Sequence, residues 1–420
     1  MGMTNEELFD RAQRVIPGGV NSPVRAFKSV GGTPYFVARA EGAYVWDVEG
    51  TRYLDLVQSY GAIIHGHAHP VIVEAIQKAA VDGTSYGAPT EREVVLAEAI
   101  AARVPSVEMV RLVSSGTEAT MSAVRVARGH TGRRKVVKFA GNYHGHGDLL
   151  LAEAGSGLAA LGLPGSAGVT DAAVADTVVA PYNQVPELDD ETACVIVEAV
   201  AANMGLVPPS DGFLKGLRAE CDRVGALLIF DEVITGFRMA YGGTQEKTGI
   251  TPDLTTFGKV IGGGLNIGAY GGRADVMHQV APLGPVYQAG TLSGNPLATA
   301  AGLAALSLLD RAAHARICLS AERLAGHLRS AFADAGIQAI VPQVDALVGL
   351  FFCDEAPTDY PSAKRTDSAR YAAFFHEMLS RGVALAPGAY EVMFPGLAHT
   401  DETIDEIGAI AHASAAALSA

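Results

Sequence analysis

The sequence predicts an α/β fold in which helices cover both faces of a mostly parallel central sheet, with a smaller α+β domain at the C-terminal end. Short runs of β-prone residues that are apolar on both faces recur through the middle of the chain, as in buried parallel strands. Helical patterns separate these runs, and this alternation implies a sheet between two layers of helices. From about residue 310 onward the pattern changes to amphipathic helices with short strands.

Composition sets the size of the fold and excludes several classes of partner. The chain of 420 residues is too long for one compact core, so we expect two or three structural domains. A formal net charge of −14 argues against nucleic acid or an anionic membrane as the main partner. The first residues have no apolar core of the kind that a signal peptide needs, and no uncharged apolar run reaches the roughly 18 residues of a membrane span. The four cysteines lack metal-ligand spacing and fit reduced thiols in a cytoplasmic protein.

The expected elements begin with an N-terminal segment, residues 1–53. After a short acidic helix start, residues 16–34 are rich in glycine and proline and predict an extended segment. Two short strand patterns follow at 35–38 and 43–48.

The large domain is expected over residues 54–309 and the small α+β domain over 310–420. We predict the helix that starts near residue 118 to end at Gly129 as its C-cap. The predicted strands of the large domain are 110–113, 136–139, 195–197 and 227–230, and its clearest helices are 118–128 and 213–223. The small domain is expected to contain helices at 321–335 and 371–381 and strands at 347–352 and 383–385.

Lys259 and Asp231 are the strongest candidates for chemistry. Lys259 stands between a strand pattern and a glycine run, where it loses hydration; its pKa is thereby lowered and its amine can condense with an aldehyde. Asp231 ends an apolar strand, so it should point into the crevice where parallel sheets bind ligands. The pair suggests pyridoxal phosphate, whose ring nitrogen stays protonated beside an acid. Alternatively, Lys259 is an ordinary surface lysine and Asp231 a helix cap.

A phosphate cradle is predicted at Ser115, Gly116 and Thr117, between a strand and a helix. Exposed amides at a helix start, two hydroxyl groups and a glycine that allows close approach suit a phosphate. The alternative is a capping box of Ser115 with Glu118. The same amides can serve the capping box and the phosphate, so the two interpretations are compatible.

Aromatic and glycine residues alternate after the strand that ends at residue 139. Tyr143 stands among glycines, and its ring could lie flat on a cofactor ring. A metal site that includes His65, His67 and His69 is disfavoured, because no acid or cysteine shell completes it. The glycine run at 262–272 is a weak dinucleotide fingerprint, and tight backbone packing around Lys259 explains it better.

Motifs spread over nearly the whole chain have the spacing of one known family. They occupy residues 15–27, 66–70, 115–120, 143–147, 231–238, 258–259 and 285–296. As a set they resemble the glutamate-1-semialdehyde 2,1-aminomutase family of class III pyridoxal phosphate enzymes. The resemblance implies a fold type I homodimer with shared active sites, which binds pyridoxal 5'-phosphate or pyridoxamine 5'-phosphate.

The resemblance also implies a role for each matched residue. Lys259 would form the Schiff base and Asp231 would pair with the pyridinium nitrogen. The other implied cofactor-binding residues are Ser115, Gly116 and Thr117 at the phosphate, Tyr143 and Val233 on the two ring faces, His144 and Asn203 nearby, and Thr291 from the partner subunit.

On the substrate side, the resemblance implies that Ser22 and Arg25 bind a carboxylate, for which the planar guanidinium is suited. Ser156 matches a mobile gating loop, Glu391 matches a carboxylate near the substrate amino groups, and Tyr60 stands at the pocket wall. The implied reaction converts glutamate 1-semialdehyde, a small amino aldehyde, to 5-aminolevulinate in tetrapyrrole synthesis, with Lys259 as general base and acid.

Several positions depart from the pattern of this family, and we expect them to gather around the substrate pocket. They are Tyr60, Ala62, His65, Ala199, Ala202, Asn266 and Gly388. The departures leave open an intermolecular aminotransferase for an amine, a β-amino acid or an amino ketone, whether they arose naturally or by engineering. A non-catalytic binding protein is disfavoured, because Lys259, Asp231 and the phosphate loop are all present.

Overall fold

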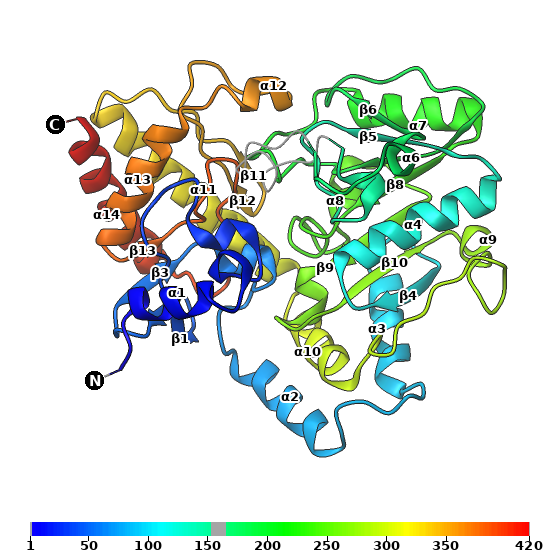
Figure 1. Cartoon of the computed structure of the whole chain (residues 1–420), viewed down its shortest axis with the longest axis horizontal. Helices are drawn as coiled ribbons and strands as arrows, with labels where there is room; N and C mark the ends of the chain where they lie inside the picture. Colours follow the sequence, from blue (N-terminus) through cyan, green and yellow to red (C-terminus); the bar gives the residue numbers. More distant parts are fainter. Residues whose placement is uncertain (1, 153–164, 420) are drawn as a thin grey trace.

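The computed structural model describes residues 2–152 and 165–419. Figure 1 shows two lobes: the N- and C-terminal regions lie together on one side, and the middle of the chain lies on the other. No helix in these described ranges is long and apolar enough to span a membrane.

A seven-stranded sheet forms the centre of the larger lobe, in the order β4-β10-β9-β8-β7-β5-β6. The strands from β9 to β6 run parallel, whereas β10 is antiparallel to both of its neighbours. The predicted mostly parallel sheet is therefore confirmed. Its strands are β4 Met109–Val113, β5 Lys135–Phe139, β6 Thr177–Ala180, β7 Thr192–Val197, β8 Leu227–Asp231, β9 Leu254–Gly258 and β10 Gly268–Gly272.

Helices cover both faces of this sheet because alternate strand residues point in opposite directions. Ile229 packs in one core with α4 (Gly116–Thr131), whereas its neighbours Leu228 and Phe230 pack in another with α7 (Phe213–Val224). The other α-helices that the described residues form in this lobe are α2 Pro70–Val81, α3 Glu91–Ala101, α6 Asp171–Val174, α8 Thr244–Thr248, α9 Ala274–Met277 and α10 Pro296–Ser307.

Strand β10 was not predicted, because three of its five residues are glycine, which weakens a strand. Its glycines allow neighbouring backbones to approach closely. A Cβ on Gly272 would lie 2.1 Å from the Asp253 carbonyl oxygen, and one on Gly268 would lie 2.2 Å from that of Ser115. The glycines at 268–272 therefore serve sheet packing, and not only the surroundings of Lys259. Strand β6 was also missed.

The predicted end of α4 at Gly129 is wrong. The helix continues to Thr131 and ends at Gly132, which has a φ of 70° and serves as the left-handed C-cap. Gly129 lies inside the helix, where a Cβ would come within 2.4 Å of a methyl group of Val286.

The smaller lobe joins the two ends of the chain in one sheet and one core. Strand β13 (Val383–Ala384) pairs in parallel with β3 (Arg52–Asp55). The rings of Phe27 and Phe375 meet edge to face at 5.1 Å. The described residues before 54 and after 309 thus share one sheet and one hydrophobic core. The other α-helices and strands that they form in this lobe are α1 Asn5–Gln13, β1 Val37–Glu41, β2 Tyr44–Asp47, α11 Arg311–Asp334, β11 Gln343–Val344, β12 Leu347–Val348, α12 Tyr360–Ala363, α13 Ser368–Ser380 and α14 Asp401–Ser419.

Candidate active site

A cavity of about 760 Å³ opens at the carboxyl ends of the central strands and is also lined by residues from the smaller lobe. Strands β8 and β9 deliver Asp231 and Lys259, because parallel neighbours end at the same edge of a sheet. The predicted site residues that line this cavity are Ser22, Arg25, Tyr60, Gly116, Thr117, Tyr143, His144, Asn203, Asp231, Val233, Lys259 and Glu391.

Three predicted residues do not line the cavity or cannot be placed there. Ser115 caps the adjacent helix instead, with its hydroxyl accepting the Glu118 amide. Thr291 is exposed on the surface of this chain. Ser156 lies outside the described residues.

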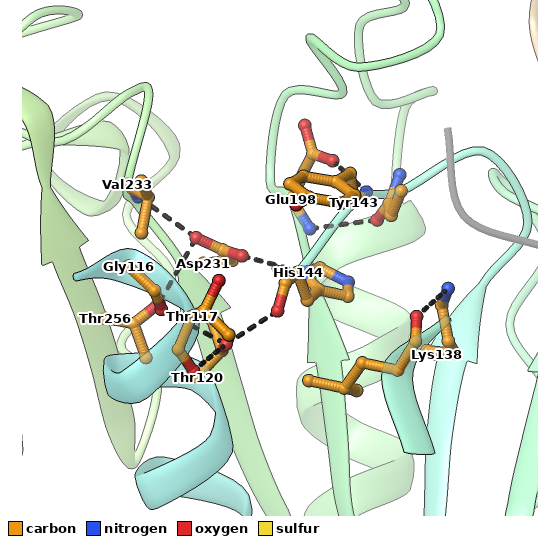
Figure 2. A network of polar contacts seen from close by, with 12 residues as sticks. Gly116, Thr117, Thr120, Lys138, Tyr143, His144, Glu198, Asp231, Val233 and Thr256 are labelled. Atoms are coloured by element: carbon orange, nitrogen blue, oxygen red, sulfur yellow. Dashed lines mark hydrogen bonds and ion pairs between the residues drawn. The ribbon is translucent and has the colours of Figure 1, made fainter. Parts of the chain in front are cut away.

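Asp231 is buried, with only 5% of its surface exposed, and each of its oxygens has a partner. Oδ1 accepts the Val233 amide at 3.0 Å and the Thr256 hydroxyl at 3.2 Å. Oδ2 lies 2.7 Å from His144 Nδ1 (Figure 2). The carboxylate is fixed at the cavity floor and does not cap a helix, which removes the alternative reading of Asp231.

His144 is the buried partner that holds Asp231 from the other side. Its carbonyl oxygen accepts the Thr120 hydroxyl at 2.6 Å, which ties the loop after β5 to helix α4. Burial lowers the pKa of the imidazole, against the opposing effect of the Asp231 carboxylate. The neutral tautomer with hydrogen on Nδ1 then donates to Asp231, and Nε2 is left buried without a hydrogen-bond partner among residues 2–152 and 165–419.

Lys259 occupies the first position of a short 3-10 helix, η5 (Lys259–Gly262), directly after β9. Its φ of 49° lies in the left-handed region, a strained conformation that clusters at functional sites. Desolvation lowers the pKa of its amine to about 8, although Glu391, Glu198 and Asp231 act in the opposite direction. This environment is incompatible with an ordinary surface lysine.

The start of α4 presents free amides to the cavity. The Ser115 hydroxyl accepts the Glu118 amide, and the Glu118 carboxylate accepts the Ser114 amide, so the expected capping box is only half formed. Gly116 and Thr117 are the first two helical residues, whose N–H groups have no carbonyl within the helix to bond. A Cβ on Gly116 would lie 3.0 Å from Val233 Cγ1, a tight contact that glycine avoids.

Glu198 is a buried carboxylate of the cavity wall that the sequence analysis did not assign to the site. One of its oxygens accepts the amide of Tyr143 at 2.8 Å (Figure 2). The other accepts the amide of Ala202, also at 2.8 Å, and the Glu198 amide donates to Asn142 Oδ1 at 3.0 Å. Desolvation raises its pKa to about 7. The residue thereby fixes the backbone that carries the Tyr143 ring. The carboxylate oxygens of Glu198 accept the backbone amides of Tyr143 and Ala202, and backbone amides leave no mark in a sequence.

The cavity has a cationic and an anionic side chain at its substrate end. Arg25 belongs to η2 (Pro23–Ala26), which Ser22 precedes, and Glu391 comes from the smaller lobe. Both charges act on the pKa of the Tyr60 phenol. Desolvation raises this pKa most, the charge of Glu391 raises it further, and the charge of Arg25 lowers it. A ligand with a carboxylate and an amino group suits this pair of charges.

The expected clustering of the seven departures around the pocket is mostly wrong. Only Tyr60 and Ala202 line the main cavity. Ala62 and His65 line a second, smaller cavity beside α2, and Asn266 is exposed. Ala199 and Gly388 are buried next to the cavity residues Glu198 and Glu391 but do not line the main cavity themselves. In the described part of the chain, no group of three or more histidine, cysteine, aspartate or glutamate residues could hold a metal ion.

The residues present fit pyridoxal 5'-phosphate. The amides of Gly116 and Thr117 form an anion site at a helix start. Tyr143 and Val233 supply an aromatic ring and an apolar side chain for the two faces of a flat ligand. Asp231 would hold the ring nitrogen, and Lys259 would supply the amine. Glycine at position 116 also lets the start of α4 pack closely against Val233, because a Cβ there would lie 3.0 Å from Val233 Cγ1.

A family profile and a curated relative both match nearly the whole chain. The aminotransferase class-III family profile matches residues 27–413. A glutamate-1-semialdehyde 2,1-aminomutase from Neisseria meningitidis serogroup C is 54% identical over 415 residues, which cover 97% of each chain.

Solved structures share the fold. An omega-transaminase from Sphaerobacter thermophilus superimposes with a TM-score of 0.90 at 33% identity, over 98% of this chain and 96% of that one. A glutamate-1-semialdehyde aminomutase from Pseudomonas aeruginosa PAO1, in complex with PMP, superimposes with a TM-score of 0.87 at 25% identity, over 98% and 93%.

Proposed function

The chain belongs to the class III aminotransferase family, and from this premise we propose that it is a glutamate-1-semialdehyde 2,1-aminomutase, which converts glutamate 1-semialdehyde to 5-aminolevulinate. One observation carries the proposal: Arg25 and Glu391 line the same cavity as Lys259. The substrate has one carboxylate for a guanidinium and amino groups that suit a carboxylate partner. The relative at 54% identity supports the same reaction.

When bound, pyridoxal 5'-phosphate or pyridoxamine 5'-phosphate supplies an electron sink and a carrier for the amino group. Gly116 and Thr117 offer amides for the phosphate, and Asp231 offers a fixed carboxylate for the ring nitrogen. His144 and the Val233 amide hold that carboxylate in place. Thr291 of a second copy would reach the phosphate, so we propose a homodimer.

Lys259 moves protons at the two substrate carbons that exchange the amino group. An amine with a pKa lowered to about 8 is partly neutral near neutral pH, so it can accept a proton and return it. Ser22 and Arg25 hold the substrate carboxylate, and this contact aligns the reacting carbons with Lys259. A cytoplasmic location accords with the four free cysteines, which the described residues include.

The intermolecular aminotransferase remains a second candidate for a specific reason. Tyr60 alters one wall of the substrate cavity, and the omega-transaminase from Sphaerobacter thermophilus shares the fold at 33% identity. Such an enzyme needs a separate amino donor.

The two candidates are separated by supplying glutamate 1-semialdehyde to purified protein loaded with pyridoxamine 5'-phosphate, with and without alanine as donor. The aminomutase forms 5-aminolevulinate at the same rate in both. An aminotransferase would instead aminate the aldehyde carbon to give 4,5-diaminovalerate and would convert alanine to pyruvate, so sustained formation of these two products only when alanine is present would favour the second candidate.

A further inference from the structure

Arg238 is a fully buried arginine that the proposed chemistry does not use. It follows β8, and 0% of its surface is exposed. Its guanidinium donates to the carbonyl oxygens of Gly61 at 3.1 Å, Ile63 at 2.8 Å and Pro395 at 3.2 Å. The guanidinium carbon also lies 5.2 Å from the centre of the Phe394 ring.

The burial of this charge is costly unless its surroundings compensate for it. Burial lowers the pKa of Arg238 to about 9. Among residues 2–152 and 165–419, no carboxylate lies within ion-pair distance of it. Three backbone carbonyls and one aromatic ring stabilise the buried positive charge. The planar guanidinium has several N–H donors, so it can bind carbonyl oxygens of separate segments at the same time.

The two segments that Arg238 joins both form the substrate end of the cavity. One is η3 (Gln58–Gly61), in which Gln58, Ser59 and Tyr60 have φ angles of 44°, 52° and 54°. Three consecutive residues in the left-handed region need external support, because each is strained. The other segment carries Glu391 and Phe394, which line the cavity.

We propose that Arg238 is a positioning residue for substrate specificity, which clamps the Tyr60 loop to the Glu391–Phe394 segment and so fixes the distance between the two substrate-facing walls. This inference rests on the proposed aminomutase function. The cofactor side of the cavity has its own supports in His144, Thr120 and Glu198. A defect at Arg238 should therefore affect substrate binding much more than cofactor binding.

The test is Arg238→Lys, which keeps a positive charge but loses the fork that reaches both segments. We expect KM for glutamate 1-semialdehyde to rise about tenfold or more while kcat changes less than about threefold, since a loosened wall weakens binding before chemistry. The dissociation constant of 5-aminolevulinate, titrated through the visible spectrum of the bound cofactor, should rise by a similar factor. The visible spectrum before titration and the thermal unfolding midpoint should stay near those of the wild type.

Arg103→Lys is the matched control. Arg103 also donates to two backbone carbonyls, of Leu306 at 2.6 Å and Leu309 at 3.2 Å, and lies over the ring of Tyr241 at 4.4 Å, but it does not line the cavity or join its walls. Its substitution should leave KM and the 5-aminolevulinate titration unchanged.

A double-mutant cycle with Tyr60→Phe adds a second readout. If Arg238 acts through the Tyr60 loop, the effect of Tyr60→Phe on KM should shrink in the Arg238→Lys background. Independent, multiplicative effects contradict the proposal. So does an Arg238→Lys protein that loses its fold or its cofactor spectrum, because Arg238 would then serve the whole protein and not the wall. If wild-type protein itself neither converts glutamate 1-semialdehyde nor responds to 5-aminolevulinate, the proposed function fails first.

Discussion

At the scale of single residues, the environment of Lys259 controls how the protein captures its cofactor. Only the neutral amine can attack an aldehyde, and desolvation has lowered its pKa to about 8. We predict that the rate at which apoprotein binds pyridoxal 5'-phosphate covalently rises with pH and levels off above about 8, as the pKa requires. Stopped-flow absorbance over a pH series measures it. A midpoint near the usual lysine pKa, or no pH dependence, would show that Lys259 is not desolvated.

Glu198 supports the Tyr143 backbone and also makes stability depend on pH. Its folded pKa is raised to about 7, so its contribution to stability is present at low pH and is lost as pH rises through about 7. A tenfold change in proton affinity corresponds to about 1.4 kcal/mol, so the loss amounts to a few kcal/mol.

Glu198→Gln tests both roles of this carboxylate. The amide has only one acceptor oxygen for the N–H groups of Tyr143 and Ala202, so the variant should be less stable than wild type by about 1–3 kcal/mol at low pH. The difference in unfolding free energy between the two proteins should narrow or reverse toward about pH 8. The wild type loses stability as Glu198 ionises, whereas the variant has no carboxylate to ionise. Urea unfolding at several pH values measures it, and a constant gap would contradict the pKa assigned to Glu198.

The sequence alone identified the residues whose chemistry is conspicuous, and it missed those that act through backbone groups. Lys259 and Asp231 follow β-prone runs, and such runs end at the ligand-binding edge of a parallel sheet. Glu198 accepts the amide of Tyr143, and Arg238 donates to the carbonyl of Pro395; both partners are distant in sequence. No local pattern encodes such partners, which only the folded chain brings together.

At the scale of elements, the phosphate end of the site depends on how closely the loop after β5 approaches the start of α4. A Cβ on Gly145 would lie 2.4 Å from the Thr117 hydroxyl oxygen and 2.6 Å from its Cα. We predict that Gly145→Ala pushes these two segments apart and weakens cofactor binding about tenfold or more, as small displacements at a preorganised site do. Equilibrium dialysis with pyridoxal 5'-phosphate measures the dissociation constant.

Gly132→Ala is the control for backbone strain. Gly132 has a φ of 70°, close to the 80° of Gly145, but a Cβ there would meet no atom within 4 Å. Both variants place alanine in the left-handed region, and only one crowds the cradle. Equal losses of cofactor affinity would mean that strain, and not crowding, is responsible.

The elements that the sequence predicted are those with regular periodicity. Helices α4 and α7 and the inner parallel strands have repeating apolar positions or continuous β-prone runs. Strand β10 has glycine where contacts between backbones require it, so its sequence resembles a loop. The end of α4 was misplaced because Gly129 and Gly132 both suit a C-cap, and only the packing of Val286 distinguishes them.

At the scale of the whole molecule, the location of Thr291 predicts an active site that needs two chains. Thr291 is exposed and outside the cavity of its own chain. If it serves the partner's phosphate site, Lys259→Ala and Thr291→Glu homodimers should both be inactive, since one lacks the amine and the other repels the phosphate.

Mixing the two variants should restore about a quarter of wild-type activity, because random exchange makes half of the dimers mixed and each mixed dimer has one intact site. To test the predicted recovery, the two variants are denatured and refolded together, and their activity is measured. Each variant refolded alone is the control. No recovery, in the presence of dimers by light scattering, would place Thr291 outside the shared site.

The most direct measurement is the number of 5-aminolevulinate molecules formed for each active site when protein loaded with pyridoxamine 5'-phosphate receives glutamate 1-semialdehyde and no other amine or carbonyl compound. An aminomutase regenerates its loaded form in every cycle, so we predict many product molecules per site. Formation of no more than one would contradict the account, because the cavity around Lys259, Arg25 and Glu391 would then serve an aminotransferase that requires a separate donor.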